Sequence, residues 1–150
     1  MDTKIRAIVV MPRERYCRIV DQLRSLDVEV LTSTTCQEAR RLLERKSRVE
    51  LVISDLSLAD GNWCDVFKHL VDTGVHAAMV VVARQADERL WSEVLWRGAY
   101  DLLVEPLDKT HVQRVVEGAV RTVQGAGARR TADDGASKEF ASETALAASQ

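Results

Sequence analysis

A single aspartate ends a short apolar run in the segment LVISDLSLADG, residues 51–61. The residues before Asp55 have the apolar character of a buried strand, and those after it are typical of a turn. A carboxylate at such a position can accept a phosphoryl group with the help of Mg²⁺, or it can hydrogen bond to the backbone amides of the turn that follows. Which chemistry applies depends on the side chains that the rest of the chain places beside Asp55.

Strand-like and helix-like segments alternate along the chain. Thr35 and Glu38 have the spacing of a helix capping box, and Gly98 follows a stretch of helical period as a helix stop. The last helical stretch carries an apolar stripe that ends at Val123. The pattern predicts five strands, each followed by a helix, at residues 5–10, 28–31, 51–54, 78–82 and 102–104.

Five strand–helix units with nearly continuous apolar strands predict an α/β fold. Its core is a doubly wound, five-stranded parallel sheet with helices on both faces. Ligand sites in such sheets lie beyond the carboxyl ends of the strands. The candidate site residues are therefore those at or just after the predicted strand ends: Met11, Pro12, Asp55, Ala83, Arg84 and Glu105.

The composition is that of an ordinary globular protein. The 150 residues are 46% hydrophobic and 29% charged, and the net charge of −2 gives no reason to expect a nucleic-acid or membrane partner. The three cysteines form no CxxC pair, and the three histidines show no metal-ligand spacing. The chain starts without the apolar core of a signal peptide. These features predict a cytoplasmic protein with no metal.

The composition changes near the C-terminus. Of the 26 residues from Gly125 to Gln150, 16 are Gly, Ala, Ser or Thr, a composition that buries too little apolar surface to order itself. We therefore expect one folded domain over residues 4–123 and a low-complexity, disordered tail over residues 124–150. Within the tail, residues 137–148 are rich enough in alanine for a weak helix that forms on a partner.

The five strand–helix units, Asp55 with its LSLADG turn and the segment RGAYDLLVEPLD at residues 97–108 resemble the receiver domains of response regulators. The resemblance covers residues 4–123, and the last segment is similar to the family's Gly-Ala…Lys-Pro stretch. It implies the flavodoxin-like receiver fold and a place in two-component signalling or a phosphorelay. In that family an aspartate at the position of Asp55 accepts a phosphoryl group beside a bound Mg²⁺.

The other positions of the family's phosphorylation pocket carry different residues here. Met11 and Pro12 align with the acidic pair that helps to hold Mg²⁺, and neither a thioether nor a proline ring is a useful ligand for that ion. Ala83 aligns with a hydroxyl, Glu105 with a lysine and Leu102 with the aromatic residue that reports phosphorylation. The resemblance is therefore to a degenerate receiver, or pseudo-receiver, which is not an enzyme and for which Mg²⁺ binding is not expected.

Three hypotheses for Asp55 remain open from the sequence. The carboxylate is phosphorylated in a non-standard pocket, or it only ends the strand and caps the next turn. In the third hypothesis Arg84, which directly follows Ala83, pairs with Asp55 or Glu105 and locks the pocket in one state without phosphate.

The stretch of helical period at residues 87–97 carries two tryptophans. Helical period places Trp91 on the core side with Leu90, Val94 and Leu95, and it places Trp96 roughly opposite them. An exposed tryptophan is either an isolated surface residue or an anchor for a partner, because tryptophan is enriched in binding hot spots.

The function favoured by the sequence is a stand-alone receiver-like signalling module that acts by phosphorylation-independent protein–protein interaction. Its expected partner is a histidine kinase, another regulator, or a second copy bound through the face of the fourth helix, fifth strand and fifth helix. One alternative is a phosphorylatable response regulator that uses Asp55. The other is a small-ligand-binding protein or enzyme that uses the strand-end pocket, although no glycine-rich phosphate loop follows the first strand.

Overall fold

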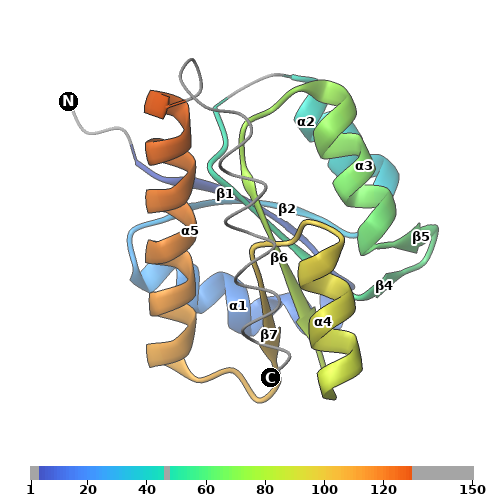
Figure 1. The fold of residues 1–150 in the computed structure, drawn as a ribbon. Coiled ribbons are helices and arrows are strands. Elements are labelled where there is room, and N and C mark those ends of the chain that lie inside the picture. Colours follow the sequence, from blue (N-terminus) through green and yellow to red (C-terminus); the bar gives the residue numbers. More distant parts are fainter. Residues whose placement is uncertain (1–3, 46–47, 130–150) are drawn as a thin grey trace.

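The computed structural model describes residues 4–45 and 48–129, and its centre is a five-stranded parallel sheet (Figure 1). The spatial order of the strands is β2-β1-β3-β6-β7. Each strand predicted from the sequence is present, with its ends within two residues of the predicted ones. The strands are β1 (Arg6–Val10), β2 (Glu29–Ser33), β3 (Leu51–Asp55), β6 (Ala78–Ala83) and β7 (Asp101–Val104). The predicted doubly wound α/β fold is confirmed.

Five helices cover the two faces of the sheet (Figure 1). On one face lie α1 (Arg13–Ser25) and α5 (Lys109–Arg129), and on the other lie α2 (Cys36–Glu44), α3 (Trp63–Thr73) and α4 (Glu88–Trp96). No helix in these described ranges is long and apolar enough to cross a membrane.

The central strand β1 shows how the sequence fills both layers. Successive side chains of a strand point to opposite faces of the sheet. Accordingly Ala7 and Val9 pack with α1 and α5, whereas Ile8 and Val10 pack with α2, α3 and α4. All four are fully buried, which explains why the strand reads as a continuous apolar run instead of an alternating one.

The predicted capping box of α2 is present in part. The Thr35 side chain accepts a hydrogen bond from the Glu38 backbone N–H at 3.1 Å, as the spacing predicts. The Glu38 carboxylate does not return to the cap residue. It accepts hydrogen bonds from the backbone N–H and the hydroxyl of Thr34, one residue earlier.

A small hairpin that the sequence analysis did not predict follows β3. Its strands are β4 (Ser57–Leu58) and β5 (Gly61–Asn62), and such short strands have no detectable period. The carboxylate of Asp60, between them, accepts hydrogen bonds from the backbone N–H groups of Cys36 at 2.7 Å and Gln37 at 3.1 Å. The hairpin therefore satisfies free amides at the start of α2.

The end of the folded part extends past the expected domain boundary. The helix α5 continues beyond Val123 to Arg129. Residues 130–150 lie outside the described part of the chain, and so does the weak helix predicted over residues 137–148.

Candidate functional site

The carboxyl ends of the strands bring the predicted site residues to one edge of the sheet. Asp55 is the last residue of β3 and Ala83 the last of β6, while Glu105 follows β7 directly. Backbone hydrogen bonds hold these ends together, because the Leu56 N–H donates to the Val82 carbonyl and the Glu105 N–H donates to the Ala83 carbonyl. The sequence analysis placed these residues correctly at the strand ends.

Asp55 lies at this edge of the sheet and is nearly inaccessible to solvent. Its side chain is 5% exposed. One carboxylate oxygen, Oδ1, accepts a hydrogen bond from the Leu56 backbone N–H at 2.8 Å, so Asp55 does cap the start of the turn. The other oxygen, Oδ2, accepts a hydrogen bond from the guanidinium of Arg15.

Arg15 joins the two carboxylates of the site. Its Nη1 donates to Asp55 Oδ2 and its Nη2 donates to Glu105 Oε1, so a single guanidinium bridges the ends of β3 and β7. The side chain of Arg15 is 13% exposed and that of Glu105 is 27% exposed. A planar guanidinium with donors on both nitrogens suits this double role, which a lysine ammonium would fill less well.

The position of Arg15 follows from the start of α1. Pro12 is the N-cap of α1, and its carbonyl accepts hydrogen bonds from the backbone N–H groups of Arg15 and Tyr16. Arg15 is therefore in the first turn of the helix, at the end that faces the carboxyl ends of the strands. It precedes the buried Ile19 by four residues, so it lies on the inward side of α1.

The two carboxylates stabilise the protonated form of Arg15. Burial by itself lowers the pKa of the guanidinium, but the hydrogen bonds to Glu105 and Asp55 and the charges of both carboxylates raise that pKa above its ordinary value. Arg15 therefore stays protonated at neutral pH, and the chain itself supplies a cation to the site.

Arg84, the cation proposed from the sequence, is not in this arrangement. Its side chain is exposed, and the ion pairs that Asp55 and Glu105 make within the described residues are both with Arg15. An arginine does pair with both carboxylates, but it is Arg15 and not the predicted Arg84. The sequence analysis missed Arg15, although its place four residues before Ile19 was the available signal.

The remaining predicted site residues belong to the hydrophobic layers or to helix α1. Met11 and Leu102 are fully buried, and Ala83 is 1% exposed. Met11 packs with the α1 and α5 layer, while Ala83 and Leu102 pack with the α2, α3 and α4 layer. Pro12 is half-buried at the start of α1. None of these four side chains presents an oxygen to Asp55.

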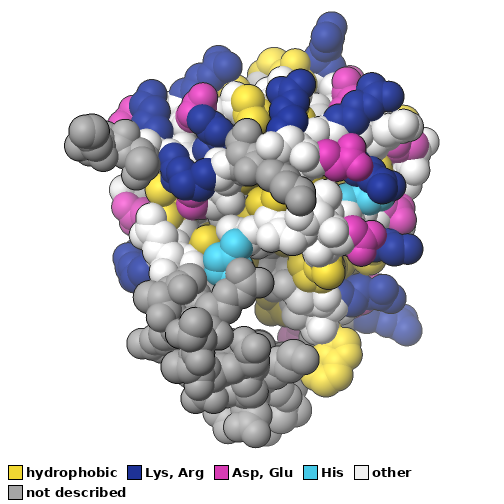
Figure 2. Space-filling view, turned by 90° about the horizontal axis from the view of Figure 1, so that it is seen from above, with side chains coloured by type: hydrophobic (Ala, Val, Ile, Leu, Met, Phe, Trp, Pro, Cys, Tyr) yellow, Lys and Arg dark blue, Asp and Glu magenta, His cyan; other side chains and the backbone are white. Residues whose placement is uncertain are grey.

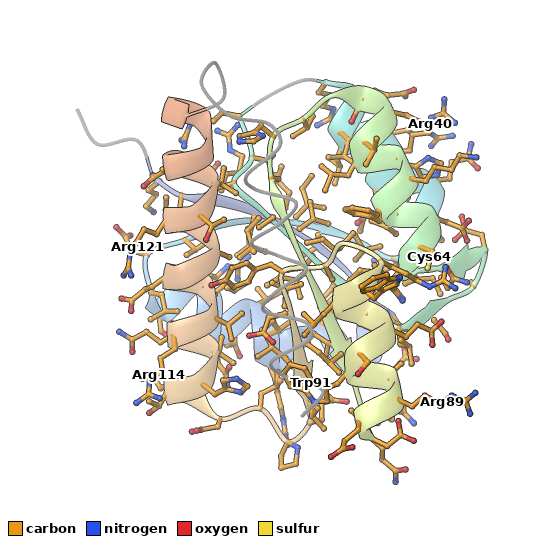
Figure 3. All side chains as sticks on the ribbon, viewed as in Figure 1. Arg40, Cys64, Arg89, Trp91, Arg114 and Arg121 are labelled. Atoms are coloured by element: carbon orange, nitrogen blue, oxygen red, sulfur yellow. The ribbon has the colours of Figure 1, made fainter. Side chains whose placement is uncertain are left out.

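Trp96 lies at the C-terminal end of α4, outside the site. It is 72% exposed, which confirms the orientation predicted from helical period. Trp91, one and a half turns earlier on α4 (Figure 3), is half-buried and packs against the α2, α3 and α4 layer, also as predicted.

Comparison with solved structures identifies the fold. A receiver domain from an HD domain-containing protein of Pseudomonas fluorescens superposes with a TM-score of 0.75 at 17% sequence identity, covering 86% of this chain and 96% of that one. The receiver domain of a putative LuxO repressor protein from Vibrio parahaemolyticus gives a TM-score of 0.72 at 17% identity, covering 81% of this chain and 94% of that one. The fold is that of a response-regulator receiver domain.

A sequence comparison also finds a similar protein. The chain is 31% identical to the two-component response regulator ARR11 of Arabidopsis thaliana over 86% of its own length. It spans 26% of the length of ARR11. No family model matches the sequence.

The Mg²⁺ ion that the receiver fold implies does not fit the residues present at this site. Mg²⁺ requires a near-octahedral set of oxygen ligands. The site offers the carboxylates of Asp55 and Glu105, one oxygen of each already accepts a hydrogen bond from Arg15, and no group of three or more potential ligands occurs in the described part of the chain. The positive charge of the guanidinium also opposes the approach of a second cation.

Removing the bridge should destabilise the fold. In Arg15→Ala the nearly buried Asp55 and the neighbouring Glu105 lose the cation that pairs with both, and we expect a loss of about 3 kcal/mol in the free energy of unfolding. Urea denaturation measures this loss.

The control is Arg40→Ala. Arg40 points into solvent from α2 (Figure 3), and the side chains of Arg40 and of its partner Glu44 are each about half exposed. That variant should lose about 0.5 kcal/mol or less. Equal losses in the two variants would contradict a structural role for the bridge.

Proposed function

We propose that this protein is a receiver-like signalling module of the two-component type that acts through protein–protein interaction without being phosphorylated. The observation that carries the proposal is the guanidinium of Arg15, which hydrogen bonds to Asp55 Oδ2 and to Glu105 Oε1. An internal cation at the position of the phosphate-accepting aspartate neutralises that carboxylate permanently. It also engages Oδ2, one of the two oxygens that could accept a phosphoryl group.

Phosphoryl transfer needs positive charge and donors that stabilise the equatorial oxygens of the transferring group. Here Arg15 supplies positive charge, but its Nη1 and Nη2 already donate to Asp55 and Glu105. Ala83 has no hydroxyl to donate, and Glu105 adds a negative charge that repels a phosphoryl group. This balance favours an interaction module over a phosphorylatable regulator.

The expected partner is a protein: a histidine kinase, another regulator or a second copy of the chain. The end of the molecule shown in Figure 2 carries basic and acidic side chains intermixed, with hydrophobic side chains among them. Such a surface does not favour a nucleic acid, which requires a clustered basic patch. Trp96 is the first candidate for an interface anchor, because at 72% it is the most exposed of the large hydrophobic side chains in the described part of the chain.

Asp55 should not take up phosphate. Incubation with acetyl phosphate or phosphoramidate and Mg²⁺, followed by intact-mass measurement, should leave the mass of the protein unchanged, because Arg15 holds the carboxylate and no metal ligands accompany it. The control is Asp55→Asn under the same conditions. A stoichiometric mass gain in the parent that disappears in Asp55→Asn would refute the proposal.

Mg²⁺ should not stabilise the parent protein. A ligand that binds only the folded state raises the melting temperature, so millimolar Mg²⁺ should leave the thermal unfolding curve in place. In Arg15→Ala the carboxylates of Asp55 and Glu105 lose their cation, and there Mg²⁺ should raise the melting temperature by partly neutralising them. A clear Mg²⁺-dependent rise in the parent would show that the ion displaces Arg15.

Trp96→Ala should weaken binding and leave the fold intact. If Trp96 is a hot spot, its removal costs about 2 kcal/mol or more of affinity for the partner, or for a second copy. Its exposure predicts a loss of about 0.5 kcal/mol or less in stability. Thermal melting and analytical ultracentrifugation measure the two effects. The half-buried Trp91 provides a contrast, since Trp91→Ala should lower the melting temperature. Unchanged association in Trp96→Ala would place the interface elsewhere.

A further inference from the structure

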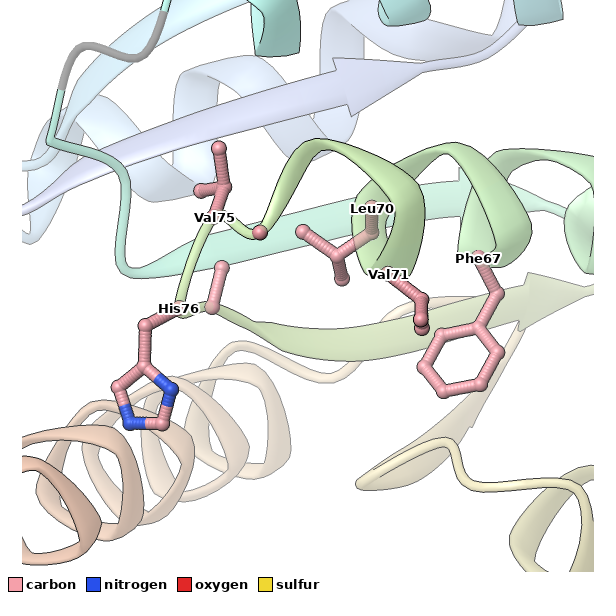
Figure 4. Close-up of a pocket in the computed structure, with 7 residues that line it drawn as sticks. Phe67, Leu70, Val71, Val75 and His76 are labelled. Atoms are coloured by element: carbon pink, nitrogen blue, oxygen red, sulfur yellow. The ribbon is translucent and has the colours of Figure 1, made fainter. Parts of the chain in front are cut away.

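A shallow apolar pocket lies at the opposite end of the sheet from Asp55. It has a volume of about 220 Å³ and is formed by the C-terminal turns of α3 and by the turn that connects α3 to β6 (Figure 4). We refer to it as the α3–β6 pocket. Its lining residues are Phe67, Leu70, Val71, Gly74, Val75, His76 and Ala77. The pocket plays no part in the arrangement of Arg15, Asp55 and Glu105.

One of the large hydrophobic side chains left exposed by the fold lines this pocket. Val71 lines it and is 63% exposed. Gly98 is packed so closely against the Phe67 ring that a Cβ on Gly98 would lie 2.8 Å from Cζ, which links the end of α4 to the pocket. Trp96 and Tyr100, the other two exposed large hydrophobic residues of the described chain, flank Gly98 in sequence. Of these three exposed residues, Val71 lines the pocket itself.

Strand β6 begins beside the pocket and extends past the start of its neighbour β7. Strand β7 begins opposite Val80, so the first residues of β6, Ala78 and Met79, extend beyond it. A hydrogen bond from the Tyr100 backbone N–H to the Met79 carbonyl marks the point where the pairing starts.

We propose that the α3–β6 pocket is the docking site for the C-terminal segment of the same chain, with Phe140 as the side chain that enters it. The segment from residue 130 to residue 150 contains two large apolar side chains, Phe140 and Leu146, in an otherwise small and polar sequence. A lone aromatic in such a sequence gains the hydrophobic free energy of burial only by binding to a surface outside its own segment.

The place where the described chain ends makes this docking possible. Helix α5 packs against β6 and ends at Arg129, at the same end of the molecule as the turn between α3 and β6 (Figure 1). The eleven residues from Arg130 to Phe140 can span up to about 36 Å when extended. A domain of this size has a radius of gyration of about 14 Å, so Phe140 reaches the pocket without strain.

Limited trypsin digestion of the full-length protein tests this docking. The bond after Lys138 lies two residues before Phe140 and should be protected while Phe140 is docked. Since cleavage follows the population of the open form, Phe140→Ala and Val71→Asp should each speed cleavage at Lys138 by about tenfold. The double variant should be cleaved no faster than either single one, because both changes remove the same contact.

The matched control is Lys68→Ala. It changes the net charge by the same amount as Val71→Asp, on an exposed position of α3 that does not line the pocket, and it should leave the cleavage rate unchanged. Far-ultraviolet circular dichroism checks that Val71→Asp stays folded. Identical cleavage of the parent and Phe140→Ala would overturn the proposal, since the pocket would then be free for an outside partner. Protection that is lost on dilution would also overturn it, in favour of the tail of a second copy.

Discussion

The parallel sheet forces the carboxyl ends of its strands to one edge, and at that edge two carboxylates must be compensated. Asp55 is nearly buried at the end of β3, and Glu105 is partly buried just after β7. Two negative charges removed from water cost several kcal/mol unless a cation is paired with them. Arg15 supplies that cation from the first turn of α1, so one side chain ties a helix of one layer to two strands of the sheet. The chemistry of the site follows from this contact.

The electrostatic constraint also explains the identity of the neighbouring residues. Once the arginine is in place, an acidic pair after β1 and a cation after β7 would disturb the charge balance. Met11 is fully buried in the hydrophobic layer, Pro12 caps α1, and Glu105 completes the pairing of the guanidinium. These residues are thus mutually consistent, because each adds to the core, caps α1 or completes the bridge, and neither Met11 nor Pro12 offers an oxygen ligand to Mg²⁺.

The fold could be predicted from the sequence because its signals are local and repeated. Loops rarely contain apolar runs as continuous as those of β1, β3 and β6, or an apolar stripe as long as that of α5. The order of the strand and helix units implies a parallel sheet. The exposure of Trp96 followed from helical period alone. The hairpin around Asp60 could not be predicted in this way, since its strands have two residues each and its role is to cap a helix that begins 24 positions earlier in the chain.

The sequence could show that Arg15 lies on the inward side of its helix, but not which residues it contacts. An arginine in an amphipathic helix is most often a solvated surface residue, and neither its period nor its neighbours show which carboxylate it reaches. Arg84 was the nearer candidate in the sequence, directly after a strand end, yet its backbone position leaves it exposed. Contacts between residues 40 and 90 positions apart, as Arg15 makes with Asp55 and Glu105, depend on tertiary placement.

The difference between an internal arginine and a phosphoryl group is thermodynamic. A ligand shifts a conformational equilibrium only by its differential affinity for the two states. A phosphoryl group can act as a switch because it is added and removed, so its effect on that equilibrium changes with time. Arg15 is part of the chain and stays protonated, so the bias that it exerts on the site is constant. Under the proposed function, a signal must then enter through another variable. The concentration of the partner is one, and access to the α3–β6 pocket is another, because neither requires the bridge between β3 and β7 to break.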